Sequence, residues 1–167
     1  MYRIRGFTLI EMLIVIVILA ILAAVALPAM SSYALRQRVS SQANELMLAL
    51  SFARAEAVKR NTDILVRPNT NTAEGWSTGW CVGPATMTNC THADRLKVFS
   101  EQLEAIVSSD DYTGTPLTFR RDGTINISGT FKVTAARLDD TSLNSRCIQI
   151  SLQGRPRIDK IKRDANC

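Results

Sequence analysis

The sequence predicts an α+β protein in which one long N-terminal helix packs on an antiparallel β-sheet head. Apolar residues dominate the start of the chain and then recur every three or four residues as far as Val58, which is the pattern of a helix that becomes amphipathic. After Thr62 the chain changes to short β-branched runs separated by Gly, Pro, Asn and Asp, as strands and turns require. Several antiparallel strands packed on one helix define the α+β class.

The first part of the helix has the composition of a membrane-crossing segment. From Met12 to Met30 the chain has 19 consecutive uncharged residues, enough for a helix to cross the hydrocarbon core of a bilayer. The basic start, MYRIRG, is short, the apolar run is longer than a typical signal-peptide core, and nothing after Ala29 and Met30 looks like a processing site. We therefore expect this helix to stay in the mature protein.

Glu11 is the only charged residue between Phe7 and Leu35. A carboxylate in hydrocarbon is costly unless it is neutral or partnered, so such a residue is a candidate functional group. The alternative is an acid at the level of the lipid headgroups that contributes little. Pro28 falls late in the same apolar run, where we expect a kink or a locally loosened helix because proline lacks the backbone donor.

The second part of the helix is expected to lie on the core of the head and to stop at Asn61 and Thr62. Its apolar stripe consists of Leu35, Val39, Ala43, Leu46, Leu50, Ala53, Ala57 and Val58. The expected strands are 63–67, 79–82, 96–99, 130–135 and 147–152, together with a hairpin of 117–120 and 124–127 around an Asp-Gly turn. Trp76 and Trp80 are expected to anchor the core or a strand edge.

The cysteines Cys81, Cys90, Cys147 and Cys167 all follow the apolar segment. An even number in this position indicates disulfide bonds in an oxidising compartment, with three possible pairings. The pairs Cys81–Cys90 and Cys147–Cys167 are favoured because each bond closes a local loop. A zinc site is the competing interpretation, but the sequence has neither a CxxC pair nor nearby histidines.

The net charge of +5 is concentrated at the C-terminus. The last 15 residues, 153–167, contain five basic and two acidic side chains, whereas residues 36–152 contain 13 basic and 12 acidic ones. A basic C-terminal tail is therefore expected on an otherwise nearly neutral head.

The motif GFTLIEMLIVIVILAILAAVALP resembles the N-terminus of type IV prepilins and type II secretion pseudopilins. The resemblance implies that prepilin peptidase cleaves after Gly6 and methylates the new N-terminal residue, Phe7. It also implies that Glu11 meets the amine of a neighbouring subunit during filament assembly, and that Pro28 helps subunits leave the bilayer. The domains would be a leader (1–6), a transmembrane and filament-core helix (7–35) and a head outside the cytoplasm (36–167).

Further motifs narrow the resemblance to the FimT/GspH group of minor pilins and pseudopilins. These motifs are ARAEAVKRN, GWSTGW, LTFRRDGTI and CIQISLQGRPRI. The tail sequence GRPR is similar to the Gly-Arg-x-Arg signature of FimT proteins linked to DNA uptake, which implies DNA binding in natural transformation. The implied DNA-binding residues are Gly154, Arg155, Arg157, Lys160, Lys162 and Arg163.

Arginine suits this role because its planar, permanently charged group can bind two phosphate oxygens. Phosphate contacts carry no sequence information, so the partner would be double-stranded DNA of any sequence. The competing interpretation is that the charged run is a solvated surface. The protein would then be a structural minor pilin that primes pilus assembly, or a GspH-like minor pseudopilin of type II secretion. In each case the partners include other major and minor pilins, and the protein resides in the inner membrane before it enters the filament.

An enzymatic function is not expected. His92 is the single histidine and has no Cys or Ser at catalytic spacing, and Asp110 and Asp111 are adjacent in a loop-like segment. No phosphate-binding glycine loop or metal-ligand cluster is present in the sequence. We expect no cofactor and no metal.

Overall fold

The computed structural model describes residues 7–72 and 74–167. The helix α1 spans Leu9–Arg60 and contributes to two compact units, one that ends at Ala34 and one that comprises Leu35–Cys167. Asn61 adopts a left-handed backbone conformation with φ of 52°, and the amide of Thr62 donates to the carbonyl of Ala57. This geometry terminates a helix, so the expected stop is confirmed.

In the first unit the apolar side chains are exposed. They include Leu9, Ile10, Leu13, Ile14, Ile16, Ile18, Leu19, Ile21 and Leu22. Within residues 7–72 and 74–167, no helix combines the length and the hydropathy of a membrane-crossing segment. The expected membrane half of the helix therefore stays a prediction.

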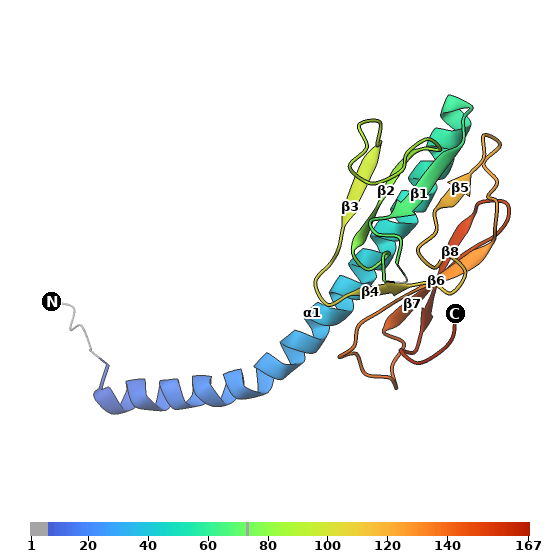
Figure 1. Ribbon diagram of the computed structural model, residues 1–167. Helices are drawn as coiled ribbons and strands as arrows, with labels where there is room; N and C mark the ends of the chain where they lie inside the picture. Colours follow the sequence, from blue (N-terminus) through green and yellow to red (C-terminus); the bar gives the residue numbers. More distant parts are fainter. Residues whose placement is uncertain (1–6, 73) are drawn as a thin grey trace. The chain divides into compact units, whose positions relative to one another are not determined.

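The second unit, which we call the head, contains two four-stranded antiparallel sheets in the part of the chain that the structure describes (Figure 1). The first sheet has the order β3-β2-β1-β5. Its strands are β1 (Ile64–Pro68), β2 (Gly79–Pro84), β3 (Lys97–Ser100) and β5 (Leu117–Phe119). The second sheet has the order β4-β6-β7-β8. Its strands are β4 (Ile106–Ser108), β6 (Gly129–Thr134), β7 (Ser145–Ile150) and β8 (Pro156–Ile161).

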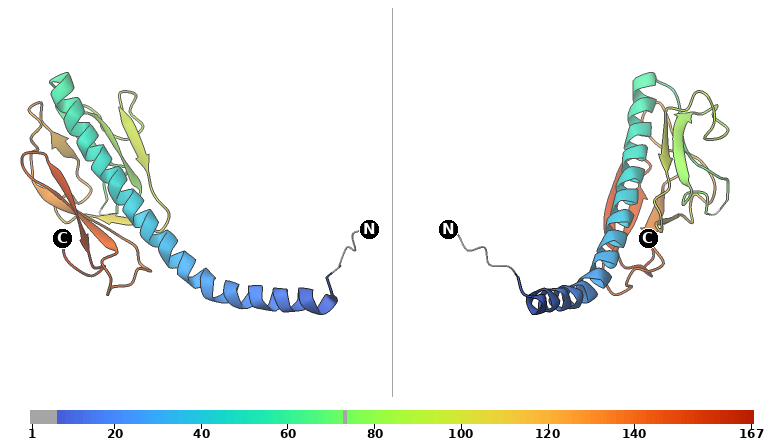
Figure 2. Two further views of the ribbon diagram at one scale, coloured as in Figure 1. Left: turned by 180° about the vertical axis from the view of Figure 1, so that it is seen from behind. Right: turned by 90° about the vertical axis from the view of Figure 1, so that its left-hand side faces the viewer.

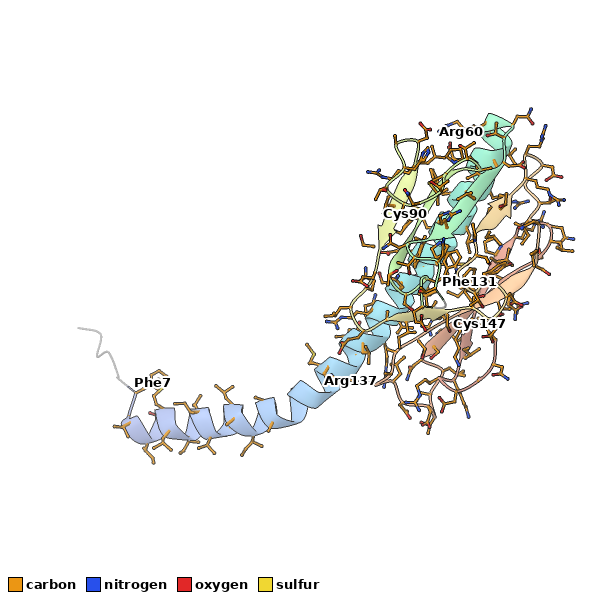
Figure 3. All side chains as sticks on the ribbon, in the orientation of Figure 1. Phe7, Arg60, Cys90, Phe131, Arg137 and Cys147 are labelled. Atoms are coloured by element: carbon orange, nitrogen blue, oxygen red, sulfur yellow. A yellow bond between two sulfur atoms is a disulfide. The ribbon has the colours of Figure 1, made fainter. Side chains whose placement is uncertain are left out.

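One continuous hydrophobic core joins α1 to both sheets. Figure 2 shows the helix of the head running along the two sheets, and its predicted stripe is buried from Leu35 to Ala57. Val58, the last residue of the predicted stripe, is instead exposed. Phe131 of β6, labelled in Figure 3, lies in this core. It packs edge-on against Trp76, with ring centroids 4.7 Å apart, and stacks on Tyr112 at 5.0 Å. The fold class is thus confirmed.

Both tryptophans are fully buried. The indole N–H of Trp76 donates to the carbonyl of Tyr112 at 2.7 Å, which satisfies the polar group that burial of this residue brings into the core. Trp80 stacks on Phe99 of the adjacent strand at 6.0 Å. Their expected role as core anchors is confirmed.

Two disulfide bonds, Cys81–Cys90 and Cys147–Cys167, are present. The first fastens the loop after β2 over the outer face of the first sheet, where Leu65 and Met87 form a small second core with the two sulfurs. This cover explains why β2 is buried on both faces. The second bond joins the middle of β7 to the last residue of the chain.

Three parts of the strand prediction need correction. Of the hairpin expected over 117–127, only β5 is a strand, and 124–127 contributes one isolated bridge between Phe119 and Ile125. Two hairpin hydrogen bonds flank this bridge, from the amide of Arg120 to the carbonyl of Thr124 at 2.8 Å and from the amide of Asn126 to the carbonyl of Thr118 at 3.3 Å. The expected turn therefore forms, but its second arm is too short to be a strand. The outward-facing amide of Ile125 donates to the carbonyl of Leu152 at 3.0 Å. The short strand β4 was not predicted. Residues 153–167 are not simply a tail, because they include β8.

The buried side chain of Gln42 yields a stability prediction. It is fully buried in the helix stripe, and neither polar atom of its amide has a hydrogen-bond partner among the described residues. Because an unpaired buried amide is costly, Gln42→Met should raise the free energy of unfolding by about 1–2 kcal/mol. Urea unfolding followed by tryptophan fluorescence would measure it, since both tryptophans lie in the core.

Gln37→Met provides the matched control, because Gln37 lies on the exposed side of the same helix. We expect this change to alter the free energy of unfolding by less than about 0.5 kcal/mol. A loss of stability in Gln42→Met would show that the buried amide makes a favourable interaction in the folded protein.

Candidate functional site

The N-terminus of α1 is closed by a reciprocal pair of hydrogen bonds between Thr8 and Glu11. The hydroxyl oxygen of Thr8 accepts the amide N–H of Glu11 at 3.2 Å, and Oε2 of Glu11 accepts the amide N–H of Thr8 at 3.1 Å. This is a capping box, which satisfies two of the donors that a helix leaves unpaired in its first turn. The Glu11 carboxylate is therefore oriented by its own chain.

Phe7 is the first residue that the structure describes, and its side chain is exposed. Gly6, after which cleavage is expected, and the rest of the leader 1–6 lie outside the described residues. Pro28 lies within α1, which continues to Arg60. The capping box places the Glu11 carboxylate beside the backbone of Thr8, one residue from the position at which cleavage would create a free amine.

At the other end of the chain, the basic residues lie on and around the edge strand β8. Every residue of β8 is paired with β7, from Pro156 opposite Ile150 to Ile161 opposite Ser145. Because β8 is the last strand of its sheet, its other edge has no strand neighbour. Alternation along the strand points Ile158 into the core and Arg157 to the outer face.

The predicted basic side chains are not equivalent. Arg155, Lys160 and Lys162 are exposed, and none of them has an ion pair or a side-chain hydrogen bond within residues 7–72 and 74–167. Arg157 is also exposed, but its guanidinium donates to Oδ1 of Asp159 at 3.0 Å on the same face of the strand. Asp159 thus neutralises part of the charge that Arg157 presents.

Arg163 is held within the head. Its NH1 donates to the carbonyl oxygens of Ala136 and Leu138, at 3.3 and 2.9 Å. Its guanidinium also pairs with Asp164 at 3.0 Å and with Asp140 at 3.7 Å. The hydrogen bond from Arg163 holds the pKa of the Asp164 carboxyl below its usual value. This arginine joins the end of the chain to the loop between β6 and β7.

Gly154 shapes the turn that precedes β8. It has a left-handed backbone with φ of 68°, and its amide donates to the carbonyl of Ser151 at 2.8 Å. A Cβ at this position would lie 2.2 Å from the carbonyl oxygen of Gly123, far inside contact distance. Only glycine allows both the conformation and the close approach. Arg155 is therefore displayed from a turn that rests against the loop after β5.

The fold brings two cations from α1 to the same end of β8. Arg54 and Lys59 line a groove together with Pro156, and Nε of Arg54 donates to the carbonyl of Gly123 at 3.1 Å. Both residues lie in the motif ARAEAVKRN, but neither was among the DNA-binding residues expected from the sequence. Their charge was visible in the sequence, but their position beside β8 depends on the contact between the helix and the second sheet.

The other titratable residues considered from the sequence have local structural contacts. His92 accepts the backbone amide of Asp94 through Nδ1 at 3.2 Å. Asp111 accepts both the amide and the hydroxyl of Thr130, at 2.8 and 3.1 Å. Asp110 lines a polar pocket whose other lining residues include Lys132 and Cys167.

Comparisons with known families and structures agree with this arrangement. Residues 1–27 match the prokaryotic N-terminal methylation motif, and residues 42–154 match the family of the type II transport protein GspH. The fold is similar to two crystal structures of the type IV minor pilin FimU from Pseudomonas aeruginosa strain PAO1. One has a TM-score of 0.59 at 22% identity and covers 72% of this chain and 91% of the FimU chain. The other has a TM-score of 0.61 at 22% identity, with coverages of 74% and 90%.

A methylation motif at the start of a long helix, followed by an antiparallel head, defines the class of type IV pilins and pseudopilins. Within this class, the chain belongs to the GspH family and is a FimT/GspH-like minor pilin, because the family match covers more than half of its length. This family consists of structural pilins, whose partners are other pilins and the peptidase that processes them.

Gly154 yields a prediction for the basic turn. Gly154→Ala should destabilise the head by about 2 kcal/mol or more, since it forces a left-handed alanine against the carbonyl of Gly123. Thermal unfolding would measure the loss. Gln153→Ala, an exposed change in the same turn, is the control and should alter stability by less than about 0.5 kcal/mol. Equal stability of the two variants would contradict the close approach of the turns.

Proposed function

We propose that this protein is a minor subunit of a type IV pilus that binds double-stranded DNA without sequence preference during DNA uptake in natural transformation. The observation that carries the proposal is the set of exposed cations on and around an edge strand. Arg155, Lys160 and Lys162 have no ion-pair partner in the described part of the chain, and Arg157 adds a fourth cation with one neutralising acid. Such an arrangement matches the phosphates of a DNA backbone.

The support beneath these cations is rigid. Hydrogen bonds to β7 hold β8 along its whole length, Gly154 anchors its first end against Gly123, and the Cys147–Cys167 bond ties the end of the chain to β7. Side chains on a fixed strand lose less conformational freedom on binding than side chains on a mobile tail. This support favours a binding surface over a merely solvated charged run.

The N-terminal unit supports assembly into a filament. Its apolar side chains are exposed, and the match to the methylation motif over residues 1–27 supports our proposal that prepilin peptidase cleaves after Gly6 and methylates Phe7. We propose that residues 7–35 anchor the protein in the inner membrane, with the head 36–167 in the periplasm, and that they later enter the filament core. Glu11 would then meet the new amine of a neighbouring pilin, and Pro28 would help the helix leave the bilayer. The protein itself would be non-enzymatic and would need no cofactor.

One observation favours a second candidate function. The match to the GspH family covers residues 42–154, so it includes most of the head but neither Arg155 nor the strand β8. A structural minor pilin that primes pilus assembly, or a minor pseudopilin of type II secretion, would need only the part that matches. The two proposals differ in whether β8 and the cations around it bind a partner. A measurement of DNA binding tests this difference directly.

Removal of the two arginines of the GRPR motif should weaken DNA binding. Arg155→Gln with Arg157→Gln should lower the affinity for duplex DNA by about tenfold or more, because bonds from charged donors to phosphate are lost. The slope of log K against log salt concentration should also fall by about two. Mobility shift over a series of salt concentrations, with the full chain in a neutral detergent, would measure both quantities.

Two further variants control for net charge. Asp159→Asn removes the acid that pairs with Arg157 and should increase the affinity. Arg95→Gln with Lys97→Gln removes two exposed cations in and before β3, at the edge of the other sheet, and should have a much smaller effect than the GRPR variant. Unchanged binding in the GRPR variant would refute the DNA-binding role and leave the structural minor pilin as the function.

Glu11→Gln should reduce incorporation of the protein into filaments without affecting its insertion into membranes. Glutamine also serves in a capping box, so the variant keeps the hydrogen bonds to Thr8 and removes only the charge that would attract the amine of a neighbour. Immunoblots of sheared filaments and of membrane fractions would measure the amount of protein in the filaments and the amount in the membrane. Thr8→Val, which removes the cap and keeps the charge, is the matched control, and equal incorporation of Glu11→Gln and the unaltered protein would contradict the role.

A further inference from the structure

A groove of about 440 Å³ runs between the last turns of α1 and the start of β8. Its lining residues are Ser51, Arg54, Ala55, Val58, Lys59 and Pro156, and we call it the α1–β8 groove. All of these residues belong to the head. The groove lies immediately beside Arg155, since Pro156 forms one of its walls.

The small side chains of Ser51 and Ala55 keep the α1–β8 groove open, because both lie on the exposed face of the helix and neither fills the space toward the strand. Pro156 is opposite Ile150 in the sheet, so it faces the inner side of β8, toward the helix. Arg157 lies on the other face of the same strand, because side chains alternate. The α1–β8 groove and Arg157 therefore lie on opposite sides of the edge of β8.

The chemistry of the α1–β8 groove is that of a phosphodiester site. Val58, which is 55% exposed, and Pro156 provide apolar surface, while Arg54 and Lys59 provide positive charge. The contact of Arg54 with the carbonyl of Gly123 uses Nε, so its two terminal nitrogens can point elsewhere. A sugar-phosphate backbone has the complementary combination, with apolar sugar faces and regularly spaced anions.

The acids near the α1–β8 groove do not cancel this charge. Glu56 is largely buried on α1 and pairs with both Arg60 and Lys59, which leaves one net positive charge among the three. Asp122, in the loop that Arg54 contacts, accepts hydrogen bonds from the amide and hydroxyl of Thr124. With Arg54 and the exposed Arg155 included, the groove and its rim are net positive.

We propose that the α1–β8 groove binds a second segment of the DNA backbone, so that the duplex contacts both sides of the β8 edge. Arg155 and Arg157 hold one segment of phosphates, and Arg54 and Lys59 hold another. This inference rests on the proposed DNA-binding function and deepens it. The helix end thereby becomes part of the DNA-binding surface, and the site extends beyond the GRPR motif to residues about a hundred positions earlier in the sequence.

Substitutions at Ala55 test the proposal, because they change the charge in the groove and leave every native cation and the Arg54 contact in place. The affinity of the full chain for a short duplex of mixed sequence should fall in the order Ala55→Lys, Ala55→Gln, Ala55→Glu. One unit charge about 7 Å from a phosphate in water changes affinity about threefold, so the Lys and Glu variants should differ by about tenfold. Fluorescence anisotropy at moderate salt concentration, with circular dichroism to verify folding, would measure the difference.

The same substitutions at Ala93 are the control. Ala93 is exposed in the loop before β3, and its Lys and Glu variants should bind DNA with nearly equal affinity. Equal affinities of the three Ala55 variants, with binding still lost in the variant that lacks Arg155 and Arg157, would refute DNA binding by the α1–β8 groove. The proposed function would then remain intact. Loss of filament incorporation in Ala55→Glu with DNA affinity unaltered would assign the groove to a neighbouring pilin instead. Absence of DNA binding by the unaltered protein would reject the proposed function, and with it this site.

Discussion

The burial of one stripe of α1 is the interaction on which the head depends. Both sheets contribute to a single core with this stripe, and neither sheet could cover its inner face without the helix. Several of the buried helix residues are alanines, including Ala43, Ala49, Ala53 and Ala57, so the backbone of the helix can lie close to the strands. The large side chains that fill the remaining space come from the sheets and their connections, such as Trp76 and Phe131. Because the core is continuous, the position of the helix end relative to β8 is determined by the same packing that stabilises the fold.

This packing also explains why glycine occurs at two neighbouring turns. Gly123 and Gly154 meet so closely that a Cβ on Gly154 would overlap the carbonyl oxygen of Gly123, while a Cβ on Gly123 would meet the side chains of Val58 and Arg54 at 3.1–3.2 Å. Three elements thus converge at one end of the head, namely the last turns of α1, the loop after β5 and the turn before β8. The junction combines the close approach of the two glycine turns with a hydrogen bond from Nε of Arg54 to the carbonyl of Gly123. Neither contact is an ion pair, whereas binding of DNA phosphates at its surface should depend strongly on salt.

Patterns that depend on neighbouring positions could be predicted from the sequence, and features that depend on distant segments could not. The helix stripe, the stop at Asn61 and most strands follow from local periodicity and turn residues, and the two disulfide bonds follow from proximity in the sequence. The strand β8 was missed because Lys160, on the same face as Pro156 and Ile158, interrupts an alternation that Arg157 and Asp159 otherwise fit. The turn of the 117–127 hairpin was predicted, but its second arm pairs with β5 only around Ile125, whose own amide bonds to Leu152, a partner that no local pattern reveals. The groove residues Arg54 and Lys59 were missed for the same reason, since nothing local connects them to Pro156.

The folded structure also changes how the basic C-terminus can act. The sequence predicts a basic C-terminal tail of five cations, but Arg163 is fixed by two carbonyls and two acids, and Arg157 shares its charge with Asp159. The cations that remain unpaired are fewer, and they lie on or directly beside a fixed strand. Each surface contact of this kind is individually weak in water and is screened by salt, so binding must rely on several contacts made at once. Contacts on both sides of a strand edge meet that requirement with few charges, and their individual weakness would let the duplex be released when the filament delivers it.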